Sequence, residues 1–211
     1  MIKLVCFDLG GVMVRLCRGW RHACEKAGVD VPTKIDDADA LLHMRDAVVQ
    51  NEIGVMGQDV FLDEVGWLFD MSRHDLQAAS DAYLDGMYDG ICDLINAVKA
   101  AGVKTACLSN TNENHWRIMT GGNGVNALPL GELDYRFASQ LIGDRKPNES
   151  IYRHVEEVTG LAGESIMFFD DSAVNIAAAA KCGWAARHVT DQTEPARMMR
   201  AYLEEAGVLG T

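Results

Sequence analysis

The sequence predicts an α/β fold in which a doubly wound parallel sheet carries one helical insertion. Short apolar runs of strand length alternate with segments in which apolar residues recur at helical spacing. Such alternation favours parallel strands joined by right-handed crossovers. The first of these runs is apolar enough for the buried centre of a parallel sheet. Residues 14–88 interrupt the alternation, because only helical periodicity is found there.

Five runs are expected to form the strands of the sheet. They are Ile2 to Phe7, Val103 to Leu108, a short run around Phe137, Ile166 to Phe169, and Trp184 to Val189. Amphipathic helices are expected between them, and glycine marks the end of several. In chain order these helices are residues 91–101 closed by Gly102, 151–158 closed by Gly160, 172–181 capped by Ser172, and one that begins at Thr193.

Residues 14–88 are expected to form the helical insertion that follows the first strand. Apolar side chains fall on one helical face in two stretches, around Trp20 and from Leu76 through Tyr83 and Leu84 to Met87. The segment Gln50-Asn51-Glu52-Ile53-Gly54 is interpreted as a loop between two helices of this insertion. A glycine-rich segment at 120–126 is predicted to be a mobile loop rather than a phosphate cradle, since no strand precedes it.

Polar side chains follow four of the predicted strands. They are Asp8, then Ser109 with Asn110, then Lys146, then Asp170 with Asp171. In parallel sheets these strand ends meet at one edge, where ligands bind. Three carboxylates together suit a hard cation such as Mg2+. A transferring phosphoryl group needs a nucleophile, which Asp8 can provide, and donors, which Ser109 and Lys146 can provide.

Each of these residues also has a plainer interpretation. Asp8 can start a turn before the glycine pair Gly10-Gly11. Lys146 can be a surface lysine before a helix, and Asp170-Asp171 can be an N-cap pair.

Four motifs decide between these interpretations, because in this order they resemble those of the haloacid dehalogenase-like hydrolase superfamily. The motifs are Phe-Asp-Leu-Gly-Gly-Val at 7–12, Leu-Ser-Asn-Thr-Asn at 108–112, Arg-Lys-Pro at 145–147 and Phe-Phe-Asp-Asp-Ser-Ala-Val-Asn-Ile at 168–176. The residues of these motifs, together with His115 and Asn175, are most similar to the sugar-phosphatase branch that includes bacterial α-D-glucose-1-phosphate phosphatase. The resemblance spans nearly the whole chain.

The resemblance implies a Mg2+-dependent phosphatase that hydrolyses a small phosphorylated metabolite, such as a sugar phosphate, through an aspartyl-phosphate. It implies a Rossmann-like core of residues 1–13 and 89–211 and a small helical cap of residues 14–88, in which the loop at 50–54 either faces the substrate or is a plain turn. The implied catalytic residues are Asp8, Ser109 and Lys146, and the substrate contacts are Ser109, Asn110, Lys146 and Gly11. The implied metal ligands are Asp8, the Gly10 carbonyl, Asp170 and Asp171, with Asn175 behind them.

One position departs from the pattern of the superfamily. Most of its phosphatases carry a second Asp two residues after the nucleophile, as general acid and base, and this chain has Gly10 there. The resembling sugar-phosphatase branch also has glycine. Candidate replacements are His115, Glu113, Asp144 or a cap residue, although His115 beside Trp116 is also typical of a partly buried histidine.

Two other functions stay open at this stage. One is metal-independent attack of Asp8 on a carbon that bears a halogen, as in haloacid dehalogenases. The other is a domain that binds a phosphorylated ligand or a protein partner with little or no turnover.

Composition excludes some classes of partner. The chain of 211 residues has 31 acidic against 19 basic residues and a net charge of −12, which disfavours nucleic acid and anionic membranes. Its six cysteines lack metal-ligand spacing and are interpreted as reduced thiols. With no signal peptide or membrane span in the pattern, we expect a cytoplasmic protein. The sequence carries no signature of oligomeric state.

Overall fold

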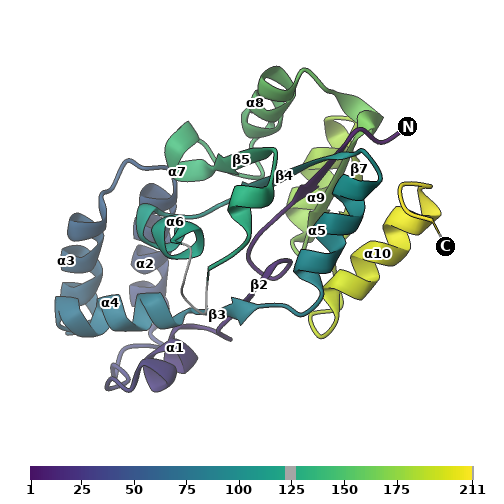
Figure 1. The fold of residues 1–211 in the computed structure, drawn as a ribbon. Helices are drawn as coiled ribbons and strands as arrows, with labels where there is room; N and C mark the ends of the chain where they lie inside the picture. The colour runs from purple at the N-terminus through teal and green to yellow at the C-terminus, as the bar shows by residue number, and fades with distance from the viewer. Residues whose placement is uncertain (122–126, 211) are drawn as a thin grey trace.

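A five-stranded parallel sheet forms the centre of the molecule (Figure 1). The computed structural model describes residues 1–121 and 127–210, so most of the glycine-rich segment at 120–126 lies outside the described residues. The strand order is β5-β4-β1-β6-β7, and all four pairings are parallel. The bounds are β1 Leu4–Phe7, β4 Lys104–Ser109, β5 Tyr135–Ala138, β6 Ile166–Asp170 and β7 Ala185–His188. All five predicted strands are therefore confirmed.

Helices cover both faces of this sheet, as the doubly wound prediction requires. Along β1, Val5 and Phe7 pack against α5 (Ile91–Ala100) and α10 (Pro195–Glu205). The alternate residues Leu4 and Cys6 pack against α8 (Glu149–Thr159) and α9 (Ala173–Lys181) on the other face. The remaining short elements of the core are α6 (Glu113–Thr120), α7 (Ser139–Ile142), η1 (Leu130–Glu132) and η2 (Gly163–Ser165).

A helical insertion lies beside the carboxyl edge of the sheet (Figure 1). It consists of α1 (Trp20–Ala27), α2 (Ala38–Glu52), α3 (Gln58–Phe69) and α4 (Arg73–Ala82). Phe61, Val65, Phe69 and Leu76 belong to a hydrophobic cluster that these helices form apart from the sheet. The insertion therefore has a small apolar core of its own.

The ends of the insertion differ from the sequence prediction. Val14–Leu16 and Leu84–Met87 are not helical; they pair as the antiparallel strands β2 and β3. Helix α4 ends at Ala82, and Gly86 in β3 has a positive φ of 86°. The pairing with β2 overrides the local helical periodicity of this stretch. The predicted loop at 50–54 is also partly wrong, because α2 continues to Glu52.

No helix in residues 1–121 or 127–210 is both long and apolar enough to cross a bilayer. All six cysteines are free thiols, and five of them are buried.

Candidate active site

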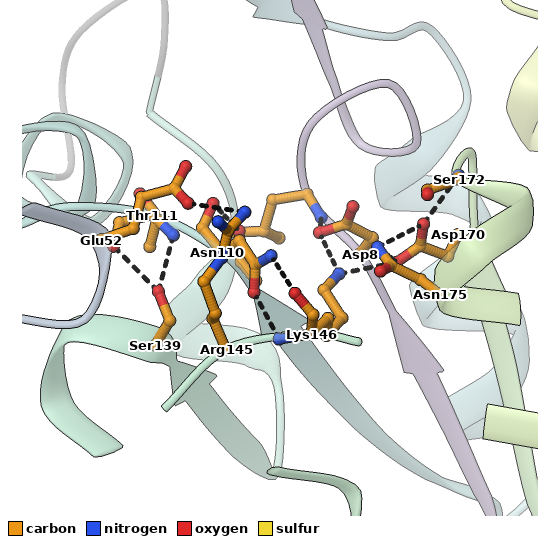
Figure 2. Close-up of polar contacts among 12 residues, drawn as sticks. Asp8, Glu52, Asn110, Thr111, Ser139, Arg145, Lys146, Asp170, Ser172 and Asn175 are labelled. Carbon is orange, nitrogen blue, oxygen red and sulfur yellow. Dashed lines mark hydrogen bonds and ion pairs between the residues drawn. The ribbon is translucent and has the colours of Figure 1, made fainter. Parts of the chain in front are cut away.

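The predicted polar residues meet at the carboxyl edge of the sheet. Figure 2 shows Asp8, Lys146 and Asp170 side by side there. Asp8 follows β1 directly, and its backbone N–H donates to the Phe169 carbonyl at 2.8 Å. Ser109 and Asp170 are the last residues of β4 and β6, the two strands that flank β1. Both are buried, at 3% and 0% exposure. The parallel topology therefore brings these groups together.

Lys146 connects two of the carboxylates. It is only 1% exposed, and its Nζ lies 2.9 Å from Asp8 Oδ1 and 2.6 Å from Asp170 Oδ2 (Figure 2). Burial lowers the pKa of Lys146, but the two carboxylates outweigh burial and raise its pKa. The interpretation of Lys146 as a surface lysine is therefore wrong, and the ammonium group is charged.

Asp170 is held from two directions. Its Oδ1 accepts a hydrogen bond of 2.8 Å from the Ser172 backbone N–H, and Asn175 Nδ2 lies 3.1 Å from both carboxylate oxygens. Ser172 is the N-cap residue of α9, as the sequence predicts, so Asp170 and Asp171 are not themselves the cap. These contacts fix the direction in which the buried carboxylate points.

Three carboxylates form a cluster at this edge. Asp8, Asp170 and Asp171 each offer an oxygen, and these atoms all lie within 4.8 Å of one another. Burial raises the pKa of Asp8 to about 7, although Lys146 opposes the shift. Burial and the Asp170 charge also raise the pKa of Asp171. Lys146 alone does not balance the charge of three carboxylates, so the cluster keeps excess negative charge. A donor set made only of oxygen atoms suits Mg2+.

The glycine pair after Asp8 contacts two different neighbours. Gly11 has a φ of 70°, and a Cβ at this position would lie 2.2 Å from Asp171 Oδ2. A Cβ on Gly10 would instead lie 2.9 Å from Leu16 Cδ1, at the end of a flexible side chain in β2. Leu16 therefore borders the space in which the second Asp of related phosphatases would begin.

The side chain of Asn110 positions the backbone of Lys146. Its Nδ2 donates to the Lys146 carbonyl, and its Oδ1 accepts from the Lys146 N–H, both at 2.9 Å. Ser139 makes a similar pair, since its Oγ accepts from the Thr111 N–H at 2.9 Å and donates to the Thr111 carbonyl at 3.0 Å. Both pairs tie the segment after β4 to the segment after β5.

A cavity of about 260 Å³ lies between this edge and the insertion. Gly10, Ser109 and Asn110 belong to its core wall. The insertion contributes Trp20, Glu52, Phe61 and Tyr83, among other residues.

Glu52 is joined to the core by an ion pair that sequence reasoning missed. Arg145 Nη2 lies 3.0 Å from Glu52 Oε2. Burial raises the pKa of Glu52, and Arg145 opposes the shift. Both residues stood in segments that the sequence analysis singled out, but nothing local indicates that they pair.

The candidates for the missing acid differ in position. His115 lines the cavity, and its Nε2 donates to the Ser80 carbonyl at 2.8 Å. Burial lowers its pKa, so the ring is neutral near pH 7. Asp144 accepts hydrogen bonds from the Arg145 backbone N–H and from Asn148 Nδ2, and it borders a second hollow. Glu113 borders a third hollow.

A model of the haloacid dehalogenase-like hydrolase family matches residues 2–183, most of the chain. The chain belongs to this family. The family that the four motifs predict is therefore confirmed, and this haloacid dehalogenase-like hydrolase has the α/β fold expected of it.

Two comparisons concern phosphate chemistry. A HAD family enzyme from Bacteroides thetaiotaomicron is 25% identical with a TM-score of 0.75, over 89% of this chain and 93% of that one. Another structure of that enzyme, at 23% identity and a TM-score of 0.73, is a complex with magnesium and inorganic phosphate. The GMP/IMP nucleotidase YrfG of Escherichia coli (strain K12) is 29% identical over 89 residues, which is 42% of this chain. The match spans only 38% of the length of that nucleotidase.

A third comparison concerns the other chemistry of the superfamily. The L-2-haloacid dehalogenase of Xanthobacter autotrophicus is 20% identical with a TM-score of 0.63, over 100% of this chain and 84% of that one. At this identity the likeness shows a shared fold alone.

Proposed function

We propose that this hydrolase is a Mg2+-dependent phosphatase that acts on a small phosphorylated metabolite, most specifically a sugar phosphate. The observation that carries the proposal is the cluster of Asp8, Asp170 and Asp171 around the buried Lys146. Dehalogenation needs no cation, and it would leave this cluster with excess negative charge. The magnesium and phosphate bound by the Bacteroides enzyme support the same choice.

Asp8 is the proposed nucleophile. The Leu9 N–H at 2.7 Å and Lys146 Nζ at 2.9 Å both bind its Oδ1, which orients the carboxylate. Attack of an Asp8 oxygen on phosphorus breaks the bond to the leaving oxygen and forms an aspartyl-phosphate. Water then hydrolyses this acyl phosphate and regenerates the carboxylate.

Asp8, Asp170, Asp171 and the Gly10 carbonyl are the proposed ligands of Mg2+, which supplies positive charge to the phosphoryl oxygens when it is bound. Ser109 and Lys146 are the proposed donors to the same oxygens. Since the Asn110 side chain is bonded to Lys146, we assign its phosphoryl contact to the backbone N–H. Asn175 orients Asp170, and the substrate contact of Gly11 stays a prediction.

The insertion is the proposed cap. Residues 14–88 carry their own hydrophobic cluster, and several of their side chains line the cavity next to Ser109. We therefore divide the chain into a cap at 14–88 and a core at 1–13 and 89–211. The residues of the four motifs, together with glycine at position 10, support assignment of the chain to the sugar-phosphatase branch.

The test is phosphate release from a panel of sugar phosphates, nucleoside monophosphates and one aryl phosphate. Each substrate is assayed with Mg2+ and with excess chelator, for the wild type and Asp8→Asn. Release that needs both Mg2+ and Asp8 supports the proposal. Full activity in chelator, or activity of Asp8→Asn near that of the wild type, contradicts it, and release from no substrate favours a binding domain.

A further inference from the structure

The lining of the cavity beside the candidate active site contains few charged side chains. Among the residues that the structure describes, Glu52 is the only acidic amino acid that lines this cavity, and His115 is the only basic one. His115 donates from Nε2 to the Ser80 carbonyl. No lysine or arginine side chain lines this cavity, and residues 122–126 contain neither type. The described lining of the cavity therefore includes one acidic side chain, which is paired with Arg145, and no lysine or arginine.

Arg145 directly precedes Lys146 in the chain and forms an ion pair with Glu52. The Arg145 side chain is 29% exposed and that of Glu52 is 18% exposed, and they form an ion pair of 3.0 Å. A carboxylate or second phosphate on a substrate would have to compete with Glu52 for this guanidinium. It would also bring a second negative charge close to the Glu52 carboxylate, which is only 18% exposed, and like charges repel there more than in bulk water.

The remaining insertion wall suits an uncharged ring. Trp20 and Tyr83 lie with ring centroids 5.4 Å apart, and Phe61 lines the same cavity. These rings offer apolar surface, while the Glu52 carboxylate can accept hydrogen bonds from hydroxyl groups. A volume of about 260 Å³ is small for a ligand site, which favours a compact ligand over a nucleoside.

We propose that Glu52 is a specificity-determining residue that admits uncharged, hydroxyl-bearing leaving groups and excludes those that carry a carboxylate or a second phosphate. The inference rests on the proposed phosphatase function. It predicts the charge of the substrate beyond the phosphoryl group, which the motifs at the sheet edge do not specify.

A matched pair of probes tests this inference. α-D-glucose-1-phosphate and glucuronic acid 1-phosphate differ only in a hydroxymethyl group that becomes a carboxylate. We expect kcat/KM of the wild type to favour the uncharged sugar at least tenfold, and Glu52→Gln to reduce this preference about tenfold, mainly through KM for the acid. If the sugars are not turned over, their inhibition constants against aryl phosphate hydrolysis give the same ratio.

Two further variants isolate the cause. Glu64→Gln removes the same charge from an exposed site on α3 and should leave the preference unchanged. In Glu52→Gln, the Arg145 guanidinium is free to bind the carboxylate of glucuronic acid 1-phosphate. The double variant with Arg145→Gln lacks this guanidinium, so its kcat/KM for that sugar should rise less than in Glu52→Gln alone. Equal use of both probes by the wild type, no change in Glu52→Gln, or an equal change in Glu64→Gln would overturn the inference.

Failure of the proposed function gives a different result. If no substrate, including the aryl phosphate, releases phosphate, that function is wrong. Calorimetric titration of both sugars into the wild type with Mg2+ then decides the charge preference separately, with the same expected ratio and the same variants.

Discussion

The two walls of the site are built in different ways. At the sheet edge, charged groups are buried and bonded to one another within the core, as in the contacts of Lys146 with Asp8 and Asp170. The insertion wall is mostly apolar and includes the rings of Trp20, Phe61 and Tyr83. Glu52 on this wall is tied to the core by its ion pair with Arg145. Under the proposed function, the first wall carries the reaction and the second wall selects the leaving group. The proposal therefore assigns reaction class and substrate choice to separate parts of the chain.

The largest expected effect comes from removing the buried lysine. Lys146→Met leaves Asp8 and Asp170 without their cation, and we expect a loss of about 3–5 kcal/mol in the free energy of unfolding. Urea denaturation in chelator measures it. The control is Lys104→Met, which breaks an ion pair with Asp134. Because the Lys104 side chain is 59% exposed, this variant should lose much less stability than Lys146→Met. Equal losses in the two variants would show that the buried network does not hold the edge together.

The second effect is a dependence of stability on pH in the metal-free protein. The pKa of Asp8 rises from 3.8 to about 7 on folding, so the native state binds more protons than the unfolded state in this interval. The contribution of Asp8 is therefore fully present below about pH 4 and is lost as the pH rises to about 7. Urea denaturation in chelator at several pH values should show this fall. The slope should be shallower in Asp8→Asn, and an unchanged slope would contradict the assignment to Asp8.

Magnesium should compensate for that loss. At a concentration a hundred times its dissociation constant, Mg2+ should add about 2.7 kcal/mol of stability, which for a chain of this size is roughly 5–10 °C in melting temperature. Differential scanning calorimetry measures the shift. Asp170→Asn should abolish it, and a similar shift in both proteins would place the cation elsewhere.

A smaller effect tests the support of Asp170. Asn175→Ala removes the amide that contacts both Asp170 oxygens, and we expect Mg2+ affinity to fall about 10- to 100-fold. Titration calorimetry gives the affinity. Asn148→Ala is the comparison, because Asn148 bonds Asp144 outside the cluster and should leave the affinity unchanged.

The smallest effect concerns the contact between insertion and core. His115→Phe keeps a ring but removes the donor to the Ser80 carbonyl, and we expect a loss of about 1 kcal/mol in the free energy of unfolding. If His115 instead supplied the missing acid, kcat would fall by a hundredfold or more. Comparing stability and kcat in this variant separates the two roles.

The sheet edge could be predicted from sequence because its signals are local. The runs predicted as β1, β4 and β6 are short and mostly apolar, and Asp8, Ser109 and Asp170 stand at their carboxyl ends, so parallel topology alone brings these three residues together. The antiparallel pair of β2 and β3 could not be predicted, since Leu84–Met87 fits a helical face and becomes a strand only by pairing with the distant Val14–Leu16. The contact of Glu52 with Arg145 depends on tertiary packing in the same way.

The two adjacent glycines have unequal freedom to change during evolution. At position 11 any other residue combines a left-handed backbone with a direct clash against Asp171, so a scan of all substitutions should find this position nearly fixed. Position 10 faces only the movable end of Leu16. A single substitution there, accompanied by rotation of one leucine, leads to the aspartate that most related phosphatases carry. The chain thus retains a short mutational route to an aspartate at this position.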